Sequence, residues 1–134
     1  MHIKNKFSNF YKDIEFGIEC SQNESEEKLK AEIERRILNY LKTFNLDLST
    51  IVQYETSEIG FTKISGRIDA LYGNVIIEYK KYALLDNEKE LNKALKQLKD
   101  KYLNKVTSRL KSKYIGILFD GKNIAFYKYN LKKD

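Results

Sequence analysis

The sequence predicts an α/β fold, in which a mixed sheet of four or five strands is flanked by helices. Two observations predict it. Two long segments, 25–45 and 86–110, carry apolar residues at helical spacing. Each is followed by a pair of short runs, at 64–81 and at 114–129, that are rich in β-branched and aromatic residues and joined by a turn. The order helix, hairpin, helix, hairpin is typical of layered α/β domains.

Each expected element has its own signal. The first helix follows the polar break 21–25, and we expect it to end near Asn45, with its outer face in water: Lys30, Glu34, Arg35 and Lys42. Residues 1–20 mix helical and alternating spacing, so their type stays open, whereas 50–59 suit an edge strand. A long second helix is expected from Asp86 to about Leu110, and Asp120-Gly121-Lys122-Asn123 is a strong turn signal.

Composition limits the classes of protein to consider. The 134 residues, 42% of them hydrophobic, fit a single domain over residues 1–134. A net charge of +6 suits a polyanionic partner but is also common in ordinary proteins. The one cysteine, Cys20, cannot form an internal disulfide, and no segment approaches the ~18 consecutive apolar residues of a membrane helix. We therefore expect a cytoplasmic protein with no membrane association.

The hairpin at 64–81 gathers charged side chains at one place. With Gly73 and Asn74 as the two turn residues, Asp69 falls directly opposite Glu78. Because side chains alternate, one face carries both cations and both carboxylates: Arg67, Asp69, Ile76, Glu78 and Lys80. The other face is apolar and fit for burial: Ile68, Ala70, Tyr72, Val75, Ile77 and Tyr79.

Facing carboxylates need a positive group. At ~5 Å they repel by about 3 kcal/mol with an effective dielectric of about 20. Mg²⁺ suits Asp69 and Glu78, since it binds one or two carboxylates, keeps several waters and leaves room for a phosphate. Lys80 is then placed to orient or deprotonate a water, or to hold the phosphate. The alternative is a solvated face on which Asp69 pairs with Lys80 and Glu78 with Arg67.

These residues resemble a known family. The run Gly66-Arg67-Ile68-Asp69-Ala70, followed by Val75-Ile76-Ile77-Glu78-Tyr79-Lys80, is similar to the D…(D/E)xK signature of the PD-(D/E)XK nuclease superfamily, with Ile68 in place of the proline. The resemblance implies a restriction-endonuclease-like three-layer core, Asp69 and Glu78 as metal ligands, and Lys80 as catalytic lysine. More narrowly, the segment resembles the N-terminal nuclease domains fused to N6-adenine DNA methyltransferases in restriction-modification enzymes.

The same resemblance implies further site residues. Glu26, on the first helix, matches a glutamate that reaches the metal, although Glu27 is a second candidate and either acid also complements the helix dipole. Gln97 matches a glutamine near the site. Related sequences often place a tyrosine four residues after this glutamine, but Tyr102 comes five after, so we assign it to the core.

Contacts to nucleic acid are the least specific expectation. Arg67 is either a phosphate contact or an ion-pair partner. Lys93 belongs to a lysine-rich helix that either meets the DNA backbone or is simply solvated: Lys89, Lys93, Lys96, Lys99, Lys101 and Lys105.

The expected function is hydrolysis of DNA phosphodiester bonds by a Mg²⁺-dependent endonuclease, with Mn²⁺ as a substitute. The expected partners are double-stranded DNA, a fused or associated DNA methyltransferase with its target-recognition region, and a second copy in a transient homodimer on DNA. Two alternatives stay open: a non-catalytic DNA-binding or docking module on the same fold, and a repair or RNA-processing nuclease.

Overall fold

The computed structural model describes residues 3–44, 52–59, 62–106 and 108–129. The expected helix end near Asn45, and residues 50–51 of the expected edge strand, lie outside these ranges. None of the helices within the ranges combines the length and the apolar content that crossing a membrane requires.

Five strands form one mixed sheet in the order β1-β2-β3-β4-β5. Their bounds are β1 Val52–Ile59, β2 Thr62–Tyr72, β3 Val75–Tyr79, β4 Ile115–Phe119 and β5 Ile124–Lys128. Neighbours are antiparallel except β3 and β4, which are parallel because the chain between them crosses over one face of the sheet. The predicted α/β class and mixed, five-stranded sheet are confirmed, and β1 is the expected edge strand.

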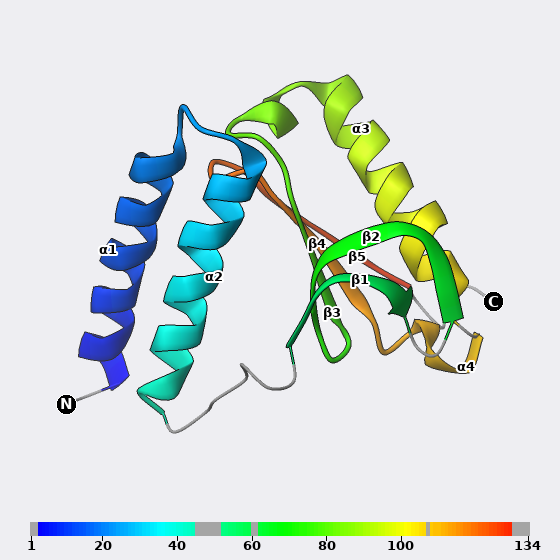
Figure 1. Ribbon diagram of the computed structural model, residues 1–134, viewed down its shortest axis with the longest axis horizontal. Coiled ribbons are helices and arrows are strands. Elements are labelled where there is room, and N and C mark those ends of the chain that lie inside the picture. The colour runs from blue at the N-terminus through cyan, green and yellow to red at the C-terminus, as the bar shows by residue number, and fades with distance from the viewer. Residues whose placement is uncertain (1–2, 45–51, 60–61, 107, 130–134) are drawn as a thin grey trace.

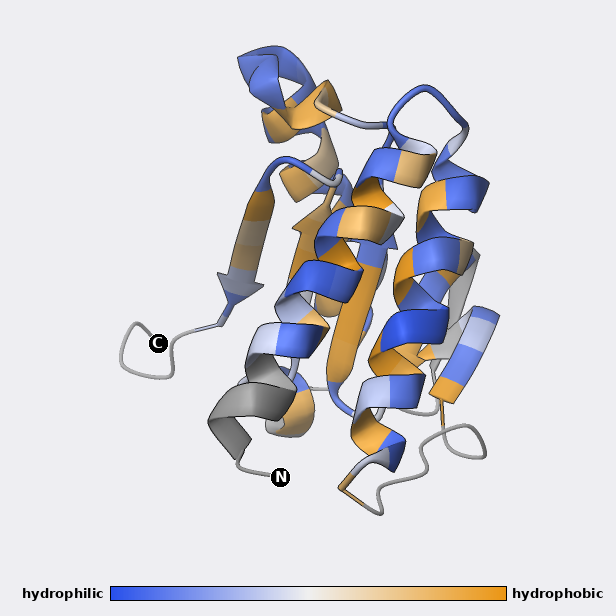
Figure 2. Ribbon diagram, turned by 90° about the vertical axis from the view of Figure 1, so that its left-hand side faces the viewer, coloured by the Kyte–Doolittle hydropathy of each residue, from blue (hydrophilic) through white to orange (hydrophobic). Residues whose placement is uncertain are grey.

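Helices cover both faces of this sheet (Figure 1). On one side, α1 (Ile3–Ser21) lies beside α2 (Glu26–Lys42), and Figure 2 shows the apolar strands behind them. The open question about residues 1–20 is thus resolved in favour of a helix over its described part, residues 3–20. Ser25 caps α2 by accepting a hydrogen bond from the Lys28 backbone N–H at 3.2 Å, as the polar break predicts.

The two faces of the sheet have separate apolar clusters. On the α2 side, Leu29 and Ile33 pack with Tyr79. On the α3 side (α3, Glu88–Gln97), a larger cluster includes Ile68 and Ile76.

The alternative of a solvated, charged face is therefore wrong, because helices cover both faces of the sheet. Ile68 also leaves its predicted face and packs in the cluster with Ile76. The β2–β3 pairing ends at Ala70, so strict alternation is not imposed on Ile68.

The single long helix predicted from Asp86 to about Leu110 is wrong. The segment begins with a short 3₁₀ turn (Leu84–Asp86) before α3, and after α3 come a π-helical turn (Leu98–Tyr102), a 3₁₀ turn (Leu103–Lys105) and a short helix, α4 (Ser108–Lys111). Val106 between them is extended, with ψ of 140°. Leu98 and Leu103 are both fully buried, and the slower winding of the π turn brings these two side chains closer to one face than an α-helix would.

The turn between β4 and β5 is built around a buried carboxylate. Asp120 is completely buried, and its Oδ1 accepts the backbone N–H groups of Lys122 and Asn123 at 2.8 and 2.5 Å. Its Oδ2 accepts the Leu85 backbone N–H at 2.8 Å. The predicted turn is confirmed. Through its bond to the Leu85 N–H, Asp120 also holds the segment that follows β3 against the turn.

Candidate active site

The β2–β3 hairpin has the register that its turn predicts. Antiparallel pairing runs outward from the turn to Ala70 opposite Ile77. Gly73 in the turn has φ of 58°, a left-handed conformation that glycine adopts without strain. The next step outward brings Asp69 opposite Glu78, which confirms the expected pair.

At this step, carboxylate oxygens replace backbone carbonyls as acceptors across the hairpin. The Asp69 backbone N–H donates to Glu78 Oε1 at 2.8 Å, and the Tyr79 backbone N–H donates to Asp69 Oδ2 at 2.8 Å. Asp69 Oδ1 and Glu78 Oε2 accept no hydrogen bond from the described residues. Each acid is thus held by the facing strand and keeps one oxygen available to a ligand.

Burial makes both acids harder to ionise, and the negative charge of Asp69 adds to this effect at Glu78. Glu78 is 5% exposed, and burial together with the negative charge of Asp69 raises its pKa to about 8. The pKa of Asp69 is also raised, chiefly by burial, while the Tyr79 N–H and the charge of Lys30 act in the opposite direction. A positive group between the two carboxylates would relieve the repulsion.

The alternative of two diagonal ion pairs is not what the structure has. Within the described ranges, no salt bridge joins Asp69 to Lys80 or Glu78 to Arg67. The charge of Lys80 still opposes the rise in the Glu78 pKa, so the ammonium acts on the carboxylate without pairing with it. The carboxylate pair is therefore left without a direct counterion from the hairpin.

Lys80 and Gln97 come together as the resemblance implies. Lys80 Nζ lies 3.5 Å from Gln97 Oε1, at the outer limit of a hydrogen bond. The Lys80 backbone N–H donates to the Phe119 carbonyl at 2.9 Å, which ties the end of β3 to β4. A backbone bond thus fixes the position of Lys80, while Gln97 restrains its ammonium only weakly.

The other predicted residues lie at the rim. Glu26 is exposed in the first turn of α2, and its charge contributes to the raised pKa of Asp69. Arg67 and Lys93 have exposed side chains, and Lys93 precedes Gln97 by about one turn of α3. The structure therefore brings together Asp69, Glu78, Lys80 and Gln97. Glu26 acts on Asp69 through its charge, whereas Arg67 and Lys93 are exposed and, among the residues that the structure describes, form no ion pair with the two acids.

Tyr102 is buried in the core, as predicted, and the structure also places it within reach of Gln97 and of the charge of Glu78. The π turn Leu98–Tyr102 winds more slowly than an α-helix, so Tyr102 lies closer to the side of Gln97 than an α-helical period predicts. The Tyr102 hydroxyl donates to the Arg67 carbonyl at 3.0 Å. Burial and the negative charge of Glu78 raise its pKa to about 12, with Gln97 acting in the opposite direction as a hydrogen-bond partner. Only the spacing of two buried leucines hinted at this turn.

Lys30 and Glu55 are two further charges near the acids that the sequence analysis missed. Lys30 was expected in water, yet its Nζ donates to Glu55 Oε1 at 2.7 Å and lies over the Tyr54 ring. Glu55 sits on β1 with φ of 51°, beside a shift in the β1–β2 register. The charges of both residues contribute to the pKa of Asp69. The poor alternation of β1 was the one available signal of its irregularity.

The donor set fits a hard divalent cation. Asp69 and Glu78 supply oxygen ligands from one point of the hairpin, and Mg²⁺ binds through one or two carboxylates with water completing its shell. No group of three or more His, Cys, Asp or Glu side chains gathers in the described part of the chain. The residues present thus suit a site that retains several waters rather than an all-protein cage.

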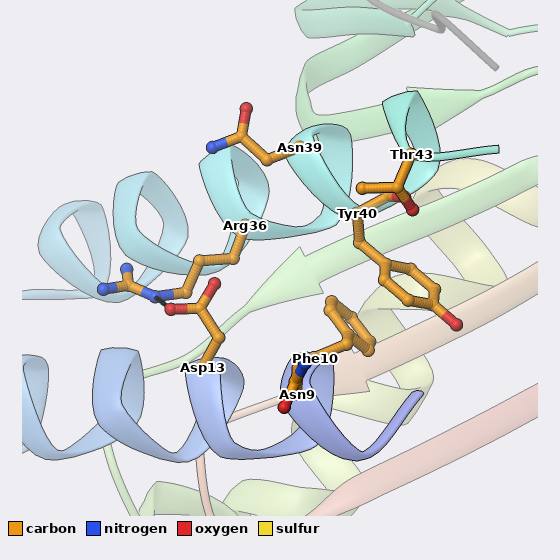
Figure 3. Close-up of a pocket in the computed structure, with 7 residues that line it drawn as sticks. All are labelled: Asn9, Phe10, Asp13, Arg36, Asn39, Tyr40 and Thr43. Atoms are coloured by element: carbon orange, nitrogen blue, oxygen red, sulfur yellow. Dashed lines mark hydrogen bonds and ion pairs between the residues drawn. The ribbon is translucent and has the colours of Figure 1, made fainter. Parts of the chain in front are cut away.

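A groove lies elsewhere, between α1 and α2 (Figure 3). It has a volume of about 470 Å³, and none of the predicted site residues lines it. Its stacked rings, Phe10 and Tyr40, lie 4.0 Å apart, and its two charged side chains, Asp13 and Arg36, form an ion pair at 3.1 Å. Because that pair neutralises its own charge, the groove offers no activated group for chemistry.

Comparison of the chain with family models, with curated proteins and with solved structures found no match. The functional argument therefore depends on the geometry of the site.

Proposed function

We propose that this chain is a Mg²⁺-dependent endonuclease domain with a restriction-endonuclease-like core, which hydrolyses phosphodiester bonds in duplex DNA. The observation that carries the proposal is the Asp69–Glu78 pair. The two acids are held against each other by backbone N–H groups, their pKa values are raised, and no side-chain counterion pairs with them in the described residues. Mn²⁺ is expected to substitute for Mg²⁺.

Each residue of the site has a role in this proposal. Bound Mg²⁺ would supply a Lewis acid for the phosphate and would lower the pKa of water. Asp69 and Glu78 hold and orient the ion, while Glu26 reaches it through water. Lys80 Nζ, restrained by Gln97 Oε1 at 3.5 Å, orients the attacking water or holds the phosphate as a point charge.

The rim supports contact with the DNA backbone. Arg67 and Lys93 are exposed, and phosphate contacts from such side chains would position a duplex without reading its sequence. We further propose that target choice is supplied by a DNA methyltransferase and recognition region, with this chain as the cleavage module. Cutting both strands would then involve transient pairing of two copies on DNA.

Plasmid cleavage with Mg²⁺ tests the proposal, with Lys80→Ala compared with the neighbouring Lys81→Ala. Lys81 is exposed and directly follows Lys80, so it controls for loss of one positive charge. We expect Lys80→Ala to lower the rate by about 10²-fold or more, as for loss of a group that acts in proton transfer. Lys81→Ala should change it by less than about threefold, because one screened surface charge contributes little. Equal loss in both variants would contradict the role of Lys80.

Metal binding and substrate range separate the alternatives. A nuclease should bind Mg²⁺ or Mn²⁺ and lose that affinity in Asp69→Ala. A non-catalytic binding module should bind DNA equally well as the parent chain and as Asp69→Ala. Parallel digestion of duplex DNA, single-stranded DNA and RNA identifies the substrate. Preferential cutting of RNA would contradict the DNA assignment and leave the metal site intact.

A further inference from the structure

A second buried carboxylate lies on the other face of the same hairpin. Glu34 of α2 was expected in water but is 5% exposed. The Tyr72 hydroxyl donates to Glu34 Oε1, and the Tyr79 hydroxyl donates to Glu34 Oε2. One side chain of the helix therefore binds one tyrosine from each strand of the hairpin.

The surroundings of Glu34 do not call for a carboxylate. Its neighbours on α2, Leu29 and Ile33, are 1% and 4% exposed and pack against the same strands. An apolar residue of similar volume would pack here without the cost of removing a charge from water, but it would leave the Tyr72 and Tyr79 hydroxyls without this acceptor. The carboxylate restricts the position of α2 relative to the hairpin, because hydrogen bonds require a narrow range of angles and distances. Aliphatic packing tolerates small shifts between the two elements.

We call Glu34 with the Tyr72 and Tyr79 hydroxyls the anchor. Tyr79 connects Glu34 to the carboxylate pair. Its hydroxyl binds Glu34, its backbone N–H donates to Asp69 Oδ2 at 2.8 Å, and it directly follows Glu78. Tyr72 is three residues beyond Asp69 on β2. A shift of α2 along the sheet would therefore be transmitted through rigid rings to the strand positions that carry both acids.

The anchor also sets the charges of α2 relative to the hairpin. Glu26, Lys30 and Glu34 follow one another at four-residue spacing, so they lie on the same side of the helix. The charges of Glu26 and Lys30 both act on Asp69. Fixing Glu34 to the two tyrosines thus fixes these charges one and two turns away.

We infer that Glu34 is a positioning residue of the Asp69–Glu78 site: by accepting hydrogen bonds from Tyr72 and Tyr79 it locks the hairpin to α2 and sets the geometry of the two acids. This inference deepens the proposed function and rests on it. Glu34 touches neither metal nor substrate in this account, so its effect passes through Tyr79.

The test compares Glu34→Leu, which removes both acceptors, with Glu34→Gln, whose amide can bond both tyrosines. We expect Glu34→Leu to lower kcat about tenfold and to raise the Mg²⁺ concentration for half-maximal cleavage about tenfold, because misplacement near 1 Å costs up to about 10²-fold. Glu34→Gln should restore both values to within about threefold. Glu32→Gln is the matched control, since Glu32 pairs with Lys28, Arg35 and Arg36 of its own helix.

Amide hydrogen exchange gives a readout that needs no activity. The Tyr79 N–H, bonded to Asp69, should exchange about tenfold faster in Glu34→Leu and keep its protection in Glu34→Gln, with the amides of β4 and β5 unchanged. If Glu34→Leu fails to fold, Tyr79→Phe removes the same hydroxyl contact and carries the same expectation.

The outcomes separate the two proposals. Unchanged cleavage, Mg²⁺ dependence and Tyr79 protection in Glu34→Leu would overturn the positioning role. A parent chain that neither binds metal nor cuts DNA would overturn the proposed function. Amide hydrogen exchange at the Tyr79 N–H would still decide whether Glu34 holds the hairpin.

Discussion

Glu34 and Glu78 lie on opposite faces of one hairpin with the same exposed fraction, 5%, but in opposite electrostatic settings. Glu34 has two tyrosine hydroxyls as donors, one for each oxygen. Glu78 has one backbone N–H and a second carboxylate beside it. The fold therefore supplies a hydrogen-bond donor for each carboxylate oxygen of Glu34 but, as far as the described residues extend, for only one oxygen of Glu78. That difference is the physical reason for assigning a cation to one side of the hairpin and a structural role to the other.

The largest expected effect is on cleavage. Glu78→Gln should lower Mg²⁺-dependent cleavage by about 10³-fold, because it removes a carboxylate ligand of the metal ion whose charge stabilises the transition state. Glu34→Gln should retain activity to within about threefold, since its amide preserves both hydrogen bonds. Rates of plasmid nicking measure both variants. Similar losses in the two would show that the two acids do not have different roles.

A third buried acid, Asp120, extends the comparison to a fully satisfied carboxylate. Asp120→Ala should lower the free energy of unfolding by about 3 kcal/mol, because it leaves one buried and two partly buried N–H donors without an acceptor. Asp86→Ala is the matched control: Asp86 bonds to Lys122 and Asn123 at the surface, and its loss should matter little. Urea denaturation measures both, and equal effects would contradict the account of the turn.

The metal-free chain should lose stability as the pH rises from about 4.5 to 8. In this range folded Glu78, with its pKa raised to about 8, keeps a proton that the unfolded chain has released. The free energy of unfolding then falls by at most about 1.4 kcal/mol per pH unit from this group. Saturating Mg²⁺ should flatten the slope, because it favours the ionised acid. Thermal unfolding across this pH range, with and without Mg²⁺ and with Glu78→Gln as control, measures how stability depends on pH. Parallel slopes for both proteins would contradict the assignment.

The smallest effect concerns the π turn. Tyr102→Phe should lower the free energy of unfolding by about 1 kcal/mol, since it removes the hydrogen bond to the Arg67 carbonyl and keeps the ring in the core. Chemical denaturation with the parent chain in parallel measures this difference. A variant as stable as the parent would show that the hydroxyl does not hold the π turn to β2.

The sequence was most informative where structure is local. The Gly73-Asn74 turn fixes which residues face each other across two short strands, so Asp69 opposite Glu78 follows from counting. The N-terminal cap of α2 and the Asp120 turn also depend on residues a few positions apart. In the cap and in the turn, the side chain and the backbone N–H groups that it binds are two or three positions apart.

Features that depend on distant segments were missed. Glu34 looks like any solvated helix acid until two tyrosines, 38 and 45 residues later, are brought against it. The spacing from Gln97 to Tyr102 excluded the tyrosine only under an α-helical period, and the π turn arises from packing Leu98 and Leu103 on the sheet. Such effects belong to tertiary packing, which residue periodicity does not contain.

Calorimetric titration of Mg²⁺ at pH 8.5 into the parent chain, Glu78→Gln and Glu34→Gln tests the central claim most directly. The account predicts saturable binding by the parent chain and by Glu34→Gln, and an affinity at least about tenfold weaker in Glu78→Gln. Equal affinity in all three proteins, or no binding by the parent chain, would contradict the assignment of a cation to Asp69 and Glu78.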